Sequence, residues 1–189
     1  MDGQADGLGY DRRVDPLTGE ASVIVAKRQA RPNLGEGART PAVACPFCPG
    51  GLEAPDDYDV KAFTNRWPSI PEGRCEIVLY TSDHDASFAS LGEAGARKVV
   101  DLWADRTAAL GARDDVAYVL VFENRGPEVG ATIPHPHGQI YAFPEVPPAP
   151  DRELATGACA LCGAEPGDRL VTAVGGWRAW VPDAATWPY

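Results

Sequence analysis

The sequence predicts an α+β fold, and two observations support this prediction. Short apolar or β-branched segments have the length of strands and occupy residues 21–26, 61–64, 76–81, 116–123, 139–143, 169–174 and 177–181. One longer segment, residues 91–110, has apolar residues spread over several helical turns. Several strands and a single long helix, without regular alternation of the two, indicate the α+β class.

The expected helix has sequence signals at both ends. Ser90 and Glu93 fit a capping box at its start, and Gly111 fits a C-cap at its end. Residues 116–123, which follow the helix, are apolar almost without interruption, so we expect a strand that is buried on both faces. Residues 144–150 are rich in proline and predict a linker at a domain boundary.

The charge of the chain limits its partners. A formal net charge of −10 argues against nucleic-acid polymers and anionic membrane surfaces. No apolar run has the length of a membrane-spanning helix, and the first residues lack the apolar core of a secretory signal, so we expect a cytoplasmic protein. Arg28 and Arg31 nevertheless stand in a basic cluster at residues 27–32. Such a cluster is usually a solvated surface, but arginine side chains also match the oxygens of a phosphate group.

Two of the three histidines, His135 and His137, are separated only by Pro136. They follow a turn rich in glycine and proline and directly precede the strand expected at residues 139–143. Because alternate residues of an extended chain point the same way, we expect His135, His137 and Gln139 to share one face. An isolated histidine is more often a surface or satisfied core residue, but two imidazoles and an amide at one spot indicate chemistry.

The cysteines suggest a metal site. The five cysteines form two Cys-x-x-Cys pairs and one single residue: Cys45 with Cys48, Cys159 with Cys162, and Cys75. In a cytosolic protein such pairs favour metal or redox chemistry over disulfides. Cys45 and Cys48 would supply two of the four ligands of a tetrahedral zinc ion, and His84 together with either His135 or His137 would supply the others. The spacing is too long for a zinc finger, so the site would fasten distant parts of the fold together.

The remaining histidine would be placed for catalysis. An imidazole next to a metal-bound neighbour, with Gln139 nearby, suits nucleophilic or acid–base chemistry. Gly126 and Gly130 would let backbone N–H groups approach phosphate oxygens, and Arg28 and Arg31 would neutralise their charge. One reaction would use all of these groups: an imidazole nitrogen attacks phosphorus and gives a covalent nucleotidyl-histidine. The alternative is a zinc domain that binds without catalysing.

A weak internal repeat predicts the domain organisation. Residues 45–68 and 159–188 each begin with Cys-x-x-Cys, continue through strand candidates and end with Trp-Pro. The second copy stops before any counterpart of His84, of the helix or of the His-Pro-His stretch. We therefore expect a complete domain at residues 1–144 and the truncated start of a second one at residues 151–189.

At these motifs the sequence resembles the galactose-1-phosphate uridylyltransferases, a branch of the histidine-triad superfamily. The matching stretches follow the family's order: Arg12-Arg13 with residues 15–19, Arg28-x-x-Arg31-Pro32, Cys45-x-x-Cys48, Phe63-Thr-Asn65, Ser82-x-His84, Phe122-Glu-Asn124 and His135-Pro-His-Gly-Gln139. Phe-Glu-Asn followed by His-Pro-His-Gly-Gln is highly specific for this branch. The resemblance implies a histidine-triad-like domain with a mainly antiparallel sheet and one helix packed on it.

The resemblance also implies roles for single residues. His137 would be the nucleophile that accepts the uridylyl group, and Gln139 would hydrogen-bond the phosphoryl group. Zinc would be bound by Cys45, Cys48, His84 and His135. The nucleotide sugar would contact Arg28, Arg31, Asn65, Asn124, Gly130, Ala131, Thr132 and Gln139. In the reaction this implies, UDP-glucose leaves UMP on the histidine, and galactose 1-phosphate then takes it, within a homodimer that serves galactose metabolism.

Two other interpretations stay open from the sequence. The pair Cys159 and Cys162 resembles relatives with a second zinc site, including the plant ADP-glucose phosphorylases, which transfer an adenylyl group to phosphate. A third interpretation is a zinc-stabilised module without catalytic activity.

Overall fold

The computed structural model describes residues 11–17, 21–25, 40–129, 131 and 133–185. The chain divides into two compact units, Met1–Pro148 and Ala149–Tyr189. None of the described helices is long and apolar enough to cross a membrane.

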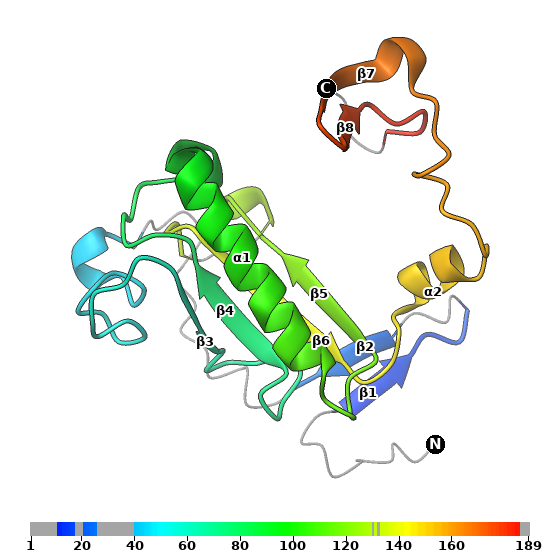
Figure 1. Cartoon of the computed structure of the whole chain (residues 1–189). Helices are drawn as coiled ribbons and strands as arrows, with labels where there is room; N and C mark the ends of the chain where they lie inside the picture. Colours follow the sequence, from blue (N-terminus) through cyan, green and yellow to red (C-terminus); the bar gives the residue numbers. More distant parts are fainter. Residues whose placement is uncertain (1–10, 18–20, 26–39, 130, 132, 186–189) are drawn as a thin grey trace. The chain divides into compact units, whose positions relative to one another are not determined.

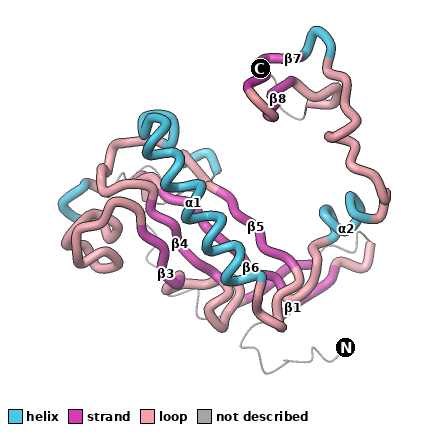
Figure 2. Tube along the Cα trace, viewed as in Figure 1, coloured by secondary structure: helices cyan, strands magenta, loops and turns pink. Residues whose placement is uncertain are grey.

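A four-stranded sheet forms the centre of the first unit (Figures 1 and 2). Its strands are β3 (Lys61–Thr64), β4 (Cys75–Leu79), β5 (Tyr118–Phe122) and β6 (His137–Phe143). They pair in the order β3-β4-β6-β5, and every pairing is antiparallel. With one long helix beside this sheet, the predicted α+β class is confirmed.

The helix α1 (Gly92–Gly111) packs on one face of the sheet (Figure 1). Val99 of α1 lies in one buried cluster with Val78 of β4 and with Ile140 and Ala142 of β6. The predicted helix is confirmed, but both predicted caps are wrong. At the C-terminal end, Gly111 is the last residue of the helix and Ala112 is the C-cap. The capping box joins Ser87 to Ser90 at the start of the 3₁₀ helix η3 (Phe88–Leu91), whereas Leu91 precedes α1 without a side-chain cap. The side-chain cap therefore lies at the start of η3, one turn before α1, and not at the start of α1 itself.

An ion pair also joins α1 to the sheet. Glu76 of β4 is only 6% exposed, and its carboxylate accepts two hydrogen bonds from Arg106 of α1, each 2.8 Å long. A buried carboxylate is costly unless it is paired, so this bidentate contact fixes the position of the helix over β4.

The prediction that the strand after the helix is buried on both faces is wrong. β5 lies at the edge of the sheet, next to β6 alone, and its residues are only partly buried. Leu120 is 37% exposed. Apolarity alone does not distinguish a central strand from an edge strand.

The alternation of burial along β6 decides which side chains face which side. Residues 138, 140 and 142 are buried towards α1, whereas residues 137, 139 and 141 are partly exposed. Gly138 is required on the helix side, because a Cβ atom there would collide with the Tyr80 hydroxyl and approach the Phe122 carbonyl within 3.2 Å. His137 and Gln139 therefore point to the sheet face opposite α1.

The other elements of the first unit are short. β1 (Asp11–Val14) and β2 (Ala21–Ile24) form an antiparallel pair. The 3₁₀ helices η2 (Ala42–Ala44) and η4 (Pro127–Val129) precede the first Cys-x-x-Cys pair and β6, respectively.

The helix α2 (Pro148–Leu154) begins inside the stretch at residues 144–150 that was predicted to be a linker. In the second unit, β7 (Leu170–Val174) follows the 3₁₀ helix η5 (Gly167–Arg169) and pairs antiparallel with β8 (Trp177–Trp180). All residues of β7 are exposed, as is Trp177. This small hairpin thus presents apolar side chains without a core of its own.

Candidate functional site

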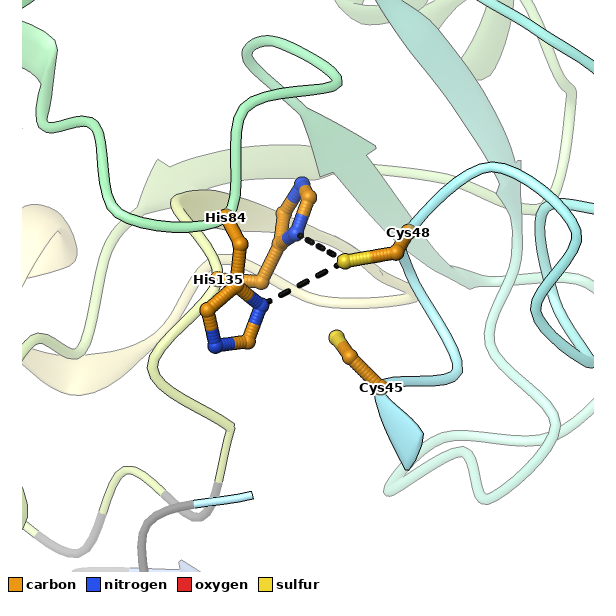
Figure 3. Close-up of side chains that lie close together, drawn as sticks. All are labelled: Cys45, Cys48, His84 and His135. Carbon is orange, nitrogen blue, oxygen red and sulfur yellow. Dashed lines mark hydrogen bonds between the residues drawn. The ribbon is translucent and has the colours of Figure 1, made fainter. Parts of the chain in front are cut away.

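Four side chains that could bind a metal ion come together from three separate segments (Figure 3). Cys45 and Cys48 lie in the turn after η2, His84 lies in the loop after β4, and His135 lies just before β6. Their ligand atoms all lie within 4.8 Å of one another. The sequence left open which histidine of the pair would join the cysteines, and the structure places His135 there.

The donor set fits a dication. Cys48 Sγ lies 3.4 Å from His84 Nδ1 and 3.5 Å from His135 Nδ1. Two thiols and two imidazoles are the ligands of tetrahedral structural zinc sites. Burial, followed by the neighbouring Cys45, raises the pKa of Cys48 to about 11, since two adjacent thiolates repel each other. A bound cation would offset both effects.

The imidazole of His135 is oriented towards the cysteines by a hydrogen bond on its far side. His135 is 1% exposed, and its Nε2 atom lies 2.8 Å from the carbonyl oxygen of Thr81. A carbonyl can only accept, so Nε2 holds the proton and Nδ1 presents its lone pair to Cys48. Burial lowers the pKa of His135, which favours the neutral ring that a metal needs. A hydrogen bond donated by the other ring nitrogen to a carbonyl is the usual support of a metal-binding histidine.

The imidazole of His137 is oriented by the same reasoning. Its Nδ1 atom lies 2.7 Å from the backbone carbonyl oxygen of His135. This carbonyl accepts a hydrogen bond from Nδ1–H, so the lone pair of the ring is on Nε2. The ring of Phe47, between the two cysteines, packs edge-on against His137 at 5.0 Å.

A cavity of about 660 Å³ lies beside His137. Its described lining includes Phe47, Phe63, Asn65, Trp67, Ile77, Asn124, Ala131, His137, Gln139 and Tyr141. The lining combines aromatic rings with aliphatic side chains and has amides at three places, which suits a ligand with a flat ring and polar edges. Among the described lining residues, Arg66 is the one cation, and its Nε lies 3.3 Å from Glu53.

A chain of polar contacts reaches Gln139 from inside the cavity wall. The hydroxyl of Tyr141 lies 2.9 Å from Ser69 Oγ and 3.4 Å from the side-chain oxygen of Gln139. Because Tyr141 donates to that oxygen, the amide NH₂ of Gln139 points away from Tyr141. Gln139 is then placed to donate to a ligand oxygen.

The expectation that His135, His137 and Gln139 share one face is only partly right. His137 and Gln139 lie two residues apart in β6 and both line the cavity. His135 precedes the strand, is not among the cavity's lining residues, and turns to the cysteines instead. The rule of alternation fails there because the strand begins only at His137.

The other predicted residues differ in what the structure describes. Asn65, Asn124 and Ala131 line the cavity. Arg28, Arg31, Gly130 and Thr132 lie outside the described residues. Cys159 and Cys162 are exposed in the second unit, and no group of three or more candidate metal ligands includes them among the described residues.

Sequence reasoning missed Tyr58, which lies in the loop between the cysteines and β3. Its hydroxyl lies 2.9 Å from His135 Nε2. Burial raises the pKa of Tyr58, so the phenol keeps its proton. The loop has no periodicity or motif that could have indicated this contact with His135.

The antiparallel sheet, the long helix packed on it and the His-Pro-His segment that leads into the inner strand β6 define an α+β protein of the histidine-triad-like class. Residues 69–147 match the family model described as galactose-1-phosphate uridyl transferase, N-terminal domain. This part of the chain is therefore similar to the N-terminal domain of that family.

Known proteins resemble the chain well beyond this domain. The chain is 44% identical to the galactose-1-phosphate uridylyltransferase of Streptomyces lividans and 37% identical to that of Thermotoga maritima, in both cases over 94% of the chain. A solved uridylyltransferase structure superposes with a TM-score of 0.75 and 30% identity, covering 94% of this chain and 63% of that one. The chain spans 54% of the Streptomyces relative and 64% of the Thermotoga relative.

Proposed function

We propose that the chain works in a nucleotidyltransferase that moves a uridylyl group from UDP-glucose to a hexose 1-phosphate, usually galactose 1-phosphate, through a covalent intermediate on His137. The observation that carries this proposal is the placement of His137. His137 lines the cavity, and its Nδ1–H donates to the His135 carbonyl 2.7 Å away, which leaves the lone pair of the ring on Nε2. The match of residues 69–147 to the uridyl transferase family model supports the same reaction.

In the first half-reaction, Nε2 of His137 attacks the α-phosphorus of UDP-glucose. The N–P bond forms while the bond from that phosphorus to the bridging oxygen breaks, and the electron pair leaves with glucose 1-phosphate. The proton stays on Nδ1 of His137, and the His135 carbonyl that accepts its hydrogen bond stabilises the positive charge that develops on the ring.

In the second half-reaction, a phosphate oxygen of the hexose 1-phosphate attacks the same phosphorus. The P–O bond forms, the N–P bond breaks, and the electron pair returns to Nε2 of His137. Gln139 is proposed to donate its amide N–H to the phosphoryl oxygens in both steps, and its contact with Tyr141 supports this direction. Arg28, Arg31, Asn65 and Asn124 are proposed to hold the nucleotide sugar, together with Gly130, Ala131 and Thr132.

We also propose that the four-residue metal group binds zinc. The two cysteines and two histidines are the ligand types zinc prefers, and their arrangement supports a closed structural site. When bound, the ion joins the cysteine turn, the loop after β4 and the start of β6. Holding His135 in the metal group also fixes its backbone carbonyl, and this carbonyl orients the ring of His137.

The intact mass of the protein tests the proposal. After mixing with UDP-glucose at neutral pH, we expect a mass increase of one UMP group, which disappears when galactose 1-phosphate is added. An adduct the size of AMP, formed with ADP-glucose only, would instead indicate the adenylyl-transferring alternative. No adduct from either donor would indicate a module that does not catalyse.

A matched variant separates chemistry from folding. His137→Gly removes the proposed nucleophile but none of the four metal-binding side chains. We expect no adduct and an unchanged metal content. An adduct that persisted in this variant would contradict the assignment.

The organisation of the whole protein is also proposed from the sequence. We propose that residues 1–144 are the catalytic domain and residues 151–189 the start of a second domain of the same kind, in a cytoplasmic homodimer. Thiols that must stay reduced to bind metal support a cytoplasmic location. Sedimentation analysis tests the dimer, and expression of residues 1–148 alone tests whether that unit folds by itself.

A further inference from the structure

One hydroxyl group contacts all three segments that provide metal ligands. Tyr58 Oη lies 2.6 Å from the carbonyl oxygen of Phe47, between the two cysteines. It lies 3.0 Å from the carbonyl oxygen of Thr81, three residues before His84. It lies 2.9 Å from the Nε2 atom of His135. The segments are far apart in the sequence, and Tyr58 belongs to none of them.

The protons in this cluster can be assigned. His135 Nε2 must hold a proton, because it lies 2.8 Å from the Thr81 carbonyl, which can only accept. That N–H also lies within reach of Tyr58 Oη, which accepts through a lone pair. The single phenol proton is then directed at the closer carbonyl, that of Phe47, at 2.6 Å. Every donor in the cluster has an acceptor, and Nδ1 of His135 is left with a lone pair towards Cys48.

We propose that Tyr58 is a positioning residue of the metal centre. Its hydroxyl fixes the tautomer of His135, and it also fixes the distance between His135 and the turn that holds Cys45 and Cys48. The inference rests on the proposed metal site. It adds to the four ligands a side chain that touches none of the metal-binding atoms and acts through His135 and through the backbone of the Cys-x-x-Cys turn.

The same contact links Tyr58 to the proposed nucleophile. The backbone carbonyl of His135 accepts a hydrogen bond from Nδ1–H of His137. A displacement of His135 therefore also displaces the acceptor that sets the tautomer of His137. Tyr58 does not line the cavity beside His137, so its effect on His137 would be transmitted through the residues it contacts, His135 and Phe47, whose ring packs against His137.

Tyr58→Phe tests the inference because it removes the hydroxyl and keeps the ring. The probe is zinc alone, measured by competition with a chromophoric chelator on the full chain without substrate. Loss of an outer hydrogen bond to a metal ligand typically weakens metal binding by about 10- to 100-fold, and we expect a loss of this size. The control is Tyr118→Phe, since Tyr118 lies at the edge strand β5 and contacts Phe143 rather than any metal-binding segment.

Circular dichroism of the zinc-free variants shows whether they are folded at the temperature of the measurement. A folded Tyr58→Phe protein with zinc affinity within about twofold of the wild type would overturn the inference. A loss of affinity equal in Tyr118→Phe would overturn it too, because it would reflect general stability.

A second measurement uses the unaltered protein and so does not depend on the folding of a variant. The chain has only three histidines, so long-range proton–nitrogen NMR spectra of histidine-labelled protein resolve each ring. We expect His135 to be protonated at Nε2, with a nuclear Overhauser effect from that proton to the Tyr58 ring. Protonation at Nδ1, or the absence of that effect, would overturn the inference.

These outcomes are independent of catalysis. A wild-type chain that binds zinc but forms no nucleotidyl adduct contradicts the proposed reaction and leaves the role of Tyr58 intact. A wild-type chain that binds no zinc overturns the metal centre and this inference with it.

Discussion

The chain contains the same motif twice, in very different surroundings. Cys45 and Cys48 lie in a turn that folds against two histidines, with Cys45 3% exposed. Cys159 and Cys162 are both exposed, and their described contacts are local, such as the 3.2 Å hydrogen bond from the Cys162 backbone to Cys159 Sγ. A Cys-x-x-Cys pair supplies only half of a tetrahedral site, so the rest of the fold decides whether it becomes a metal centre.

The comparison also shows how the two pairs differ as thiols. Burial and the neighbouring thiol raise the pKa of Cys48. Hydrogen bonding from Cys162 lowers the pKa of Cys159. Cys48 therefore resists ionisation unless a cation is bound, whereas Cys159 ionises more easily than an ordinary thiol.

Replacing one cysteine of each pair should give the largest contrast. We expect Cys45→Ser to lose the metal and to lower the free energy of unfolding strongly, and Cys159→Ser to change neither. Structural zinc contributes apparent binding free energies of about 10–16 kcal/mol in zinc-finger peptides, comparable to the whole stability of about 5–15 kcal/mol of an ordinary domain. Metal analysis and thermal unfolding check both variants. A Cys45→Ser protein with full metal content and unchanged stability would refute the assignment.

The two neighbouring histidines sharpen the comparison within the first site. Because His135 belongs to the metal group and His137 to the cavity, we expect His135→Ala to lose metal. We expect His137→Asn to keep the metal and to lose activity by on the order of 10⁴-fold or more, as removal of a nucleophile typically does. Steady-state uridylyl transfer and metal content should be measured on the same samples. Loss of metal from both variants would show that the two roles are not separate.

Much of the fold follows from local sequence patterns, and the site follows from them only in part. The apolar spacing at residues 91–110 predicts the helix almost to the residue, because such a pattern depends only on neighbours within a few turns. The pattern at residues 116–123 predicts a strand but not its place at the sheet edge, which depends on strand order.

The metal group shows the same limit. Residue types and counts indicated Cys45, Cys48 and His84, but they did not distinguish His135 from His137, because that depends on where β6 begins. The contacts of Tyr58 with the metal group could not be predicted from the sequence. Its hydroxyl acts on backbone carbonyls of other segments, and no pattern in its own segment records a contact of that kind.

A smaller effect is expected when the reactivities of the two Cys-x-x-Cys pairs are compared. In metal-free protein at pH 8, we expect iodoacetamide to modify Cys159 at least about 10-fold faster than Cys48. A pKa of about 11 in place of the usual 9.0 leaves roughly 100-fold less thiolate below both values, and the greater nucleophilicity of the more basic thiolate offsets only about 10-fold of this. Peptide mapping by mass spectrometry measures both rates, and equal rates would contradict the difference between the pairs. The rate at Cys48 should rise with pH up to about 11.

The smallest effect is expected in the cavity wall. Tyr141→Phe removes the 3.4 Å hydrogen bond to Gln139 and leaves the metal group untouched. A neutral hydrogen bond is worth about 0.5–1.5 kcal/mol, which corresponds to a decrease in kcat of about 2- to 12-fold. Tyr118→Phe is the matched control. A decrease as large as that of His137→Asn would mean that Tyr141 acts directly on the substrate.

The position of the covalent adduct tests the central claim most directly. The wild-type chain should be loaded with UDP-glucose, kept near neutral pH because phosphorus–nitrogen bonds hydrolyse in acid, and examined by native mass spectrometry followed by peptide fragmentation. We predict one metal ion and one uridylyl group on the same chain, with the uridylyl group on His137. A uridylyl group on another residue, or a metal-loaded chain that acquires none, would contradict the account.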